Sequence, residues 1–182
     1  MKNKILCVLI AVSATMAWDL PSADVATEDK VKAAYVYHII NFVNWPANSL
    51  DNSTRPITIC LIGEVDFQQS LLSLQNREVK KHFIDIKKIS SAEYQTGCHI
   101  LFVGDDSTQK VKEILRDTDD QAILTLGDFP GFVELGGMIG FTKRGNNIRL
   151  EINLDAAHKA GITISAKLAE VAVNIIGGPE QE

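Results

Sequence analysis

Three short apolar runs constrain the fold of this chain more than any other feature of its sequence. They cover residues 56–63, 99–104 and 122–126, and apolar side chains occupy nearly every position of each run. Strands of this kind are typical of parallel sheets whose two faces are both covered. Apolar residues at helical spacing follow the first run over 66–74 and the second over 107–115.

One more strand, over 83–89, is predicted from alternation of apolar and polar residues. The resulting order is strand, helix, strand, strand, helix, strand. This order predicts an α/β fold with a mostly parallel central sheet, flanked by helices and connected by right-handed crossovers.

The flanking segments complete the predicted domain, residues 27–177. A helix is expected from Thr27, a plausible N-cap, to about Asn44, because Pro46 ends it. Residues 138–153 predict a β-hairpin, and a short helix over 154–160 follows. We expect a C-terminal helix starting after Ser165, on the helical spacing of Leu168, Val171, Ala172, Ile175 and Ile176.

Residues 1–17 have the pattern of a cleaved signal peptide. Lys2 and Lys4 precede an apolar segment of about a dozen residues, which is shorter than the roughly 20 needed to span a bilayer. Ala17 ends a small-residue cleavage site, and Ala23 offers a later one. The sequence therefore predicts export to the periplasm of a mature protein with no membrane span.

Cleavage would remove Cys7 and leave Cys60 and Cys98. An even cysteine count in an oxidising compartment favours a disulfide, and the two residues fall at neighbouring predicted strands. We therefore predict a Cys60–Cys98 disulfide, with two free buried thiols as the alternative. No further cysteine or histidine stands at zinc-site spacing, so no metal is expected.

The net charge of the chain and the motifs that it lacks exclude several classes of function. The chain carries a net charge of −5, which becomes −7 without residues 1–17, and has no basic stripe for nucleic acid. It contains no dinucleotide fingerprint, no phosphate-binding GxxxxGK motif and no GxSxG or HExxH sequence. We therefore predict a binding protein that is not an enzyme, with no catalytic residues and no cofactor.

Two polar groups could form a binding surface. Acidic residues follow the predicted strands at Glu64, Asp105, Asp106 and Asp128, where they could hold a cation or simply cap helices and turns. On the second hairpin strand one face is polar, which predicts either cross-strand pairing or a ligand or partner surface at Arg149, Glu151 and Asn153.

The first helix has apolar residues on more than one face. This excess predicts either deep burial or an interface with a partner. The candidate partner-binding residues are Tyr35, Tyr37, Ile40 and Trp45.

Ordered sequence blocks along nearly the whole mature chain carry a family resemblance. They lie at residues 31–46, 59–63, 98–102, 124–132, 136–141 and 149–161. Together they resemble the YfiR family of exported bacterial proteins. The resemblance implies a periplasmic negative regulator of a YfiN-type membrane diguanylate cyclase, which makes cyclic-di-GMP. It further implies contact with the periplasmic region of that cyclase, relief by an outer-membrane lipoprotein, and a homodimer.

The resemblance also bears on the cysteines. Cys60 and Cys98 match one family cysteine pair, while a second pair has no counterpart among the mature residues. The alternative function is a periplasmic small-ligand-binding or accessory protein for another envelope receptor, such as a sensor kinase.

Overall fold

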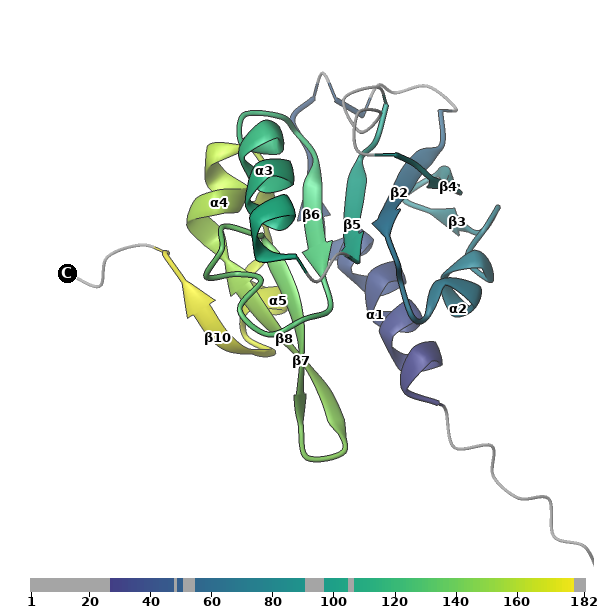
Figure 1. The fold of residues 1–182 in the computed structure, drawn as a ribbon. Helices are drawn as coiled ribbons and strands as arrows, with labels where there is room; N and C mark the ends of the chain where they lie inside the picture. The colour runs from purple at the N-terminus through teal and green to yellow at the C-terminus, as the bar shows by residue number, and fades with distance from the viewer. Residues whose placement is uncertain (1–26, 48, 51–54, 91–96, 105–106, 179–182) are drawn as a thin grey trace, which may run out of the picture.

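The computed structural model describes residues 27–47, 49–50, 55–90, 97–104 and 107–178. Eight of the ten described strands form one sheet in the order β10-β8-β7-β6-β5-β2-β4-β3 (Figure 1), and the other two pair separately. The bounds of the eight strands are β2 Ile57–Gly63, β3 Glu78–Val79, β4 His82–Lys88, β5 Ile100–Gly104, β6 Leu124–Gly127, β7 Ile139–Arg144, β8 Asn147–Asn153 and β10 Ala172–Ile176. The helices are α1 Glu28–Phe42, α2 Gln68–Leu72, α3 Thr108–Thr118, α4 Leu154–Lys159 and α5 Ala166–Ala169.

Five neighbouring strands, β4, β2, β5, β6 and β7, run parallel to one another. Strand β8 is antiparallel to β7, β10 is parallel to β8, and β3 is antiparallel to β4. The predicted α/β fold with a mostly parallel sheet flanked by helices is therefore confirmed.

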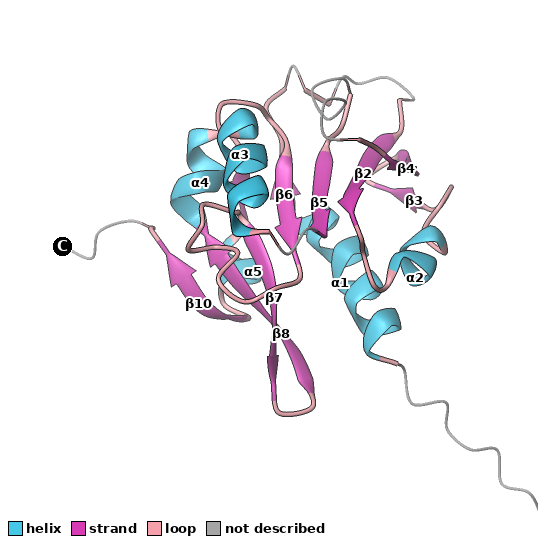
Figure 2. Cartoon of the chain, in the orientation of Figure 1, coloured by secondary structure: helices cyan, strands magenta, loops and turns pink. Residues whose placement is uncertain are grey.

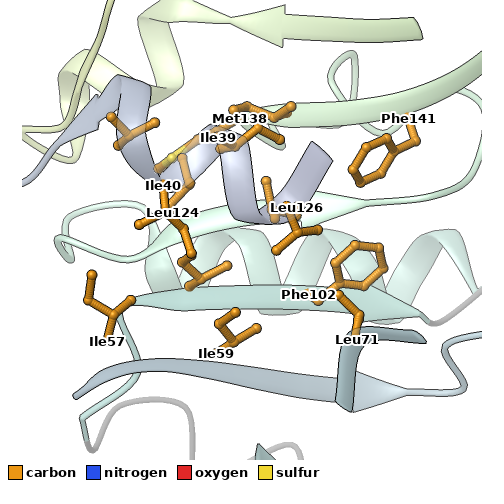
Figure 3. Close-up of a cluster of buried hydrophobic side chains, with 14 of the residues drawn as sticks. Ile39, Ile40, Ile57, Ile59, Leu71, Phe102, Leu124, Leu126, Met138 and Phe141 are labelled. Atoms are coloured by element: carbon orange, nitrogen blue, oxygen red, sulfur yellow. The ribbon is translucent and has the colours of Figure 1, made fainter. Parts of the chain in front are cut away.

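The core has a layer on each face of the sheet. On one face the strands pack against α1, as Figure 3 shows for Ile39 and Ile40 above the central strands. On the other face, Leu101 and Val103 of β5 pack with Val111 of α3. Both faces of β2 and β5 are thus covered, which explains why their sequences are apolar at successive positions.

Helix α1 starts where the sequence predicts but ends two residues earlier. Thr27 has the extended backbone of an N-cap, although its side chain makes no capping hydrogen bond. The helix ends at Phe42 because Val43–Asn44 form β1, which pairs antiparallel with β9, Thr163–Ile164. Pro46 therefore follows a short strand and does not directly stop the helix.

The predicted C-terminal helix is wrong beyond its first turn. Ser165 caps the four-residue helix α5, accepting a hydrogen bond from the Leu168 backbone N–H, and the chain then forms strand β10. Val171, Val173 and Ile175 are β-branched and alternate, which suits a strand better than a helix. Strand β10 pairs with the edge of β8 that faces away from β7, so that backbone groups of β10 find hydrogen-bond partners there.

The predicted β-hairpin is confirmed. Arg144 of β7 pairs with Asn147 of β8, and Gly145 in the turn has a left-handed φ of 61° that favours glycine. The hairpin projects past the neighbouring strands (Figure 2).

Candidate functional site

A crevice opens at the carboxyl ends of the central parallel strands. From β2 the chain passes by way of α2 to β4 on one side, and then returns to β5 on the other side of β2. Connections that diverge in this way leave a crevice at the switch point, which is the usual ligand site of an open α/β sheet. Here it has a volume of about 480 Å³, within the range of small-molecule sites. Its lining includes Gly63, Glu64, Val65, Asp66, Phe67, Phe102, Val103, Gly104, Lys110, Asp128 and Phe129.

The ends of β2 and β5 approach each other closely beneath this crevice. A Cβ atom on Gly104 would lie 2.1 Å from the Glu64 carbonyl oxygen, so a side chain there would push the two strand ends apart. Gly63 turns the chain out of β2 with a left-handed φ of 77°. The shape of the crevice therefore depends on two glycines that end neighbouring strands.

A chain of ion pairs fixes one wall of the crevice. The Lys32 Nζ of α1 lies 2.7 Å from Asp128 Oδ2 and 2.7 Å from Glu28 Oε1. Lys143 Nζ of the β7–β8 hairpin lies 2.7 Å from Glu28 Oε2. Lys32 is buried and Asp128 is partly buried. These contacts connect α1, the end of β6 and the hairpin through charge.

Burial and ion pairing shift the pKa values of Asp128, Lys32 and Glu28. Burial raises the pKa of Asp128, and Lys32 offsets this only in part. Burial alone would lower the pKa of Lys32, but the hydrogen bonds that its ammonium donates to Asp128 and Glu28 outweigh burial and raise that pKa. Hydrogen bonds from Lys143 and Lys32 lower the pKa of Glu28 to about 2. The lysine therefore stays charged between its two carboxylates.

Two of the four acidic residues that follow the predicted strands are seen at the crevice. Glu64 and Asp128 both line it, but Glu64 pairs with Lys88 at 3.3 Å and Asp128 pairs with Lys32. Asp105 and Asp106 lie outside the described residues. Among the described residues, no group of three His, Cys, Asp or Glu side chains is placed to hold a metal. The lining combines carboxylates, the Lys110 side chain and aromatic rings, which suits recognition of a small polar molecule.

The predicted disulfide is present. Cys60 in β2 and Cys98, just before β5, are bonded with their Cα atoms 5.8 Å apart. Both are buried on the α3 face of the sheet. The bond joins the approach to β5 to the middle of β2, the two strands that flank the crevice.

The four partner-binding candidates on and after α1 do not form one exposed patch. Ile40 is fully buried, and Trp45 is largely buried with its Nε1 donating to the His99 carbonyl at 3.1 Å. Tyr35 is half-buried. Tyr37 donates through its hydroxyl to the Glu78 carbonyl at 3.0 Å.

This placement explains the excess of apolar residues on α1. The helix packs on the sheet and also contacts α2 and β3, so that two of its sides are covered. The Arg77 guanidinium lies 4.6 Å from the centre of the Tyr37 ring. Partner binding by these residues stays a prediction, and within the chain they serve packing.

The three polar candidate residues of β8 differ in their exposure to solvent. Arg149 is exposed, and Glu151 is partly exposed. Asn153 is buried: its Oδ1 accepts from the Ala156 backbone N–H at 2.9 Å and its Nδ2 donates to the Val133 carbonyl at 3.0 Å. Asn153 therefore caps α4, and a surface role on this strand is left to Arg149 and Glu151 as a prediction.

Lys32 is a residue of this site that no sequence pattern predicted. Its position was visible as a lysine in the buried stripe of α1, four residues after Glu28. Its partner Asp128 is 96 residues away, and no local pattern could reveal that contact.

A family model described as YfiR/HmsC-like matches residues 29–173. A solved structure, a conserved domain protein from Vibrio cholerae O1 biovar El Tor strain N16961, is 15% identical with a TM-score of 0.55, which shows the fold. The match covers 81% of this chain and 60% of that chain. Among the described residues, no helix has the length and apolar character needed to span a bilayer.

Proposed function

Because this chain belongs to the YfiR/HmsC-like family, we propose that it is an exported regulatory protein that represses a membrane diguanylate cyclase by binding the cyclase's periplasmic region. The observation that carries this proposal is the extent of the family match, which runs from α1 into β10. The signal-peptide pattern of residues 1–17 and the Cys60–Cys98 disulfide support the same compartment. The proposed role is regulation by contact and not catalysis.

Two further elements of this proposal rest on the family resemblance. One is relief of repression by an outer-membrane lipoprotein that sequesters the regulator. The other is a homodimer as the working form of the protein. Residues 27–177 are proposed to act as a single domain in both contacts.

The experiment that tests this function measures cyclic-di-GMP in the native host. Deleting the gene should raise the cyclic-di-GMP level, and deleting a candidate membrane cyclase in the same strain should abolish the rise. Complementation with the full chain should restore the low level, whereas a version lacking residues 1–17 should not. An unchanged cyclic-di-GMP level after deletion, with no binding of the purified protein to the cyclase's periplasmic region, would refute the proposal.

The crevice favours a second candidate function, a periplasmic small-ligand-binding or accessory protein for another envelope receptor. Its volume and its mixed polar and aromatic lining at the strand switch point are those of a ligand site. Lys110→Glu would reverse the charge of an exposed lining side chain without crowding the strand ends. Comparing the effect of envelope extracts on the melting temperatures of this variant and the wild type therefore separates the two functions. A small-molecule fraction that stabilises only the wild type supports the second candidate.

A further inference from the structure

Among the described strands, β10 lies at one edge of the sheet and pairs on one side only. It pairs with β8 on one side and ends the strand order on the other, as Figure 1 shows at the yellow end of the chain. Three large apolar residues on and beside it are exposed: Val171 by 56%, Val173 by 44% and Ile175 by 44%. An edge with an apolar stripe is a template for pairing with another strand.

The opposite edge of the sheet is protected in a way that β10 is not. Strand β3 is two residues long, and Lys80 and Lys81, which follow it, have left-handed φ angles of 51° and 68°. Short length, irregular backbone and lysines are the usual means of blocking an edge strand. Residues 171–178 contain neither a charged residue nor a proline. The chain therefore blocks one edge of its sheet and leaves the other uncharged.

We infer that β10 pairs antiparallel with β10 of a second copy of this chain, so that one sheet continues across the dimer. This inference deepens the homodimer of the proposed function and rests on it. A two-fold axis through the edge places the same apolar stripe on both sides of the contact, which satisfies an isologous interface. Residues 171–178 hold no charge, so two mature chains, each with a net charge of −7 once residues 1–17 are removed, meet there without repulsion between facing side chains.

The distribution of exposed apolar side chains favours a second copy of this chain as the partner of β10. Among the described residues, five large apolar side chains are exposed, and three of them form this stripe. The other two, Leu72 and Phe83, lie on α2 and β4. The stripe therefore holds most of the large exposed apolar side chains of the described residues, and a second copy presents an identical stripe to it. Since stable interfaces bury about 800 Å² on each partner, a contact centred on one short strand predicts a reversible dimer.

Sedimentation velocity of the exported protein over a range of concentrations tests this inference. The wild type should show a reversible monomer–dimer equilibrium, and Val173→Lys should weaken association at least tenfold with an unchanged melting temperature. Phe83→Lys is the matched control, because it places the same charge at an exposed apolar position away from β10, and it should associate like the wild type. A dimeric Val173→Lys protein would overturn the β10 contact while leaving the homodimer proposal intact. A wild type that stays monomeric would overturn both.

Cysteine crosslinking supplies a second measurement if Val173→Lys fails to fold. Single substitutions Val171→Cys, Val173→Cys and Ile175→Cys add one thiol each, since Cys60 and Cys98 are already bonded. Across a two-fold axis, residues near the axis face their own copies at about 5 Å, within disulfide range. Mild oxidation should therefore crosslink one of these variants efficiently, and Phe83→Cys should not crosslink. Absence of a crosslink at all three positions, or equal crosslinking of Phe83→Cys, would overturn the inference.

Discussion

Lys32→Met is the substitution that most directly tests the charged wall of the crevice. Methionine keeps the apolar stem of the lysine but removes the ammonium that lies 2.7 Å from both Asp128 and Glu28. Glu28 is exposed and keeps its ion pair with Lys143, so losing its pair with Lys32 lowers the free energy of unfolding only slightly. Asp128 is partly buried and would lose its lysine partner, which costs about 1–3 kcal/mol. We expect a total loss of about 2 kcal/mol, or a melting temperature lower by about 4–8 °C for a domain of this size.

The effect of Lys32→Met should depend on pH with a defined sign. Burial already raises the pKa of Asp128, and removing Lys32 removes the opposing influence and raises it further. A carboxyl with a higher pKa in the folded than in the unfolded state binds its proton more tightly when folded. The free energy of unfolding of the variant therefore approaches that of the wild type as the pH falls through the raised pKa of Asp128. The difference is largest near neutral pH.

Urea unfolding of both proteins between pH 4 and 8 measures this difference. Lys143→Met is the matched control, because it removes a half-exposed lysine from the same chain of ion pairs and should cost under about 0.5 kcal/mol. Adding Asp128→Asn to Lys32→Met removes the stranded carboxylate and should recover most of the loss. A penalty for Lys32→Met that does not change with pH, or that the added substitution does not reduce, would refute this reasoning.

Four other predictions concern stability and processing. Cys98→Ala should lower the free energy of unfolding by about 2–5 kcal/mol in urea titration, and non-reducing peptide mapping of the native protein should find no free thiol. Asn153→Ala should cost about 1–3 kcal/mol, because it removes the α4 cap and a second buried hydrogen bond. Tyr37→Glu should lower the melting temperature, since the residue packs within the chain; lost association with unchanged folding would instead support the docking surface predicted for this helix. Intact-mass measurement of periplasmic protein should give an N-terminus at Trp18 or Asp24.

The sequence predicts those helices and strands whose pattern of burial or pairing is evident from residues close to them in the chain. Residues 56–63 and 99–104 are apolar at successive positions because both faces of β2 and β5 are covered, and that pattern is visible in the chain itself. The β7–β8 hairpin is similarly local, since its two strands are joined by a two-residue turn. The disulfide follows from compartment, cysteine count and the predicted strands.

The parts that the sequence does not predict depend on long-range pairing. The apolar residues of 168–176 fit a helical spacing, and only the open side of β8 decides that most of them form a strand. The sequence left open whether the excess apolar residues of α1 are buried or bind a partner, and only the structure shows that α2 and β3 cover the helix from a second side. The Lys32–Asp128 ion pair joins residues 96 positions apart, and its effect on the crevice became visible only in the structure.

The Cys60–Cys98 bond has a consequence for local opening of the sheet. The covalent loop that it closes contains helix α2 and the strands β3 and β4, and these two strands form one end of the sheet. If β3 and β4 separate from β2, the bond still tethers β2 to the start of β5. Native-state hydrogen exchange should therefore show the amides bonded between β4 and β2 exchanging through a low-energy opening, while the amides bonded between β2 and β5 exchange only on global unfolding. Reduction of the bond should bring the two classes of amide closer together, because the strands beneath the crevice would then lose their covalent tether.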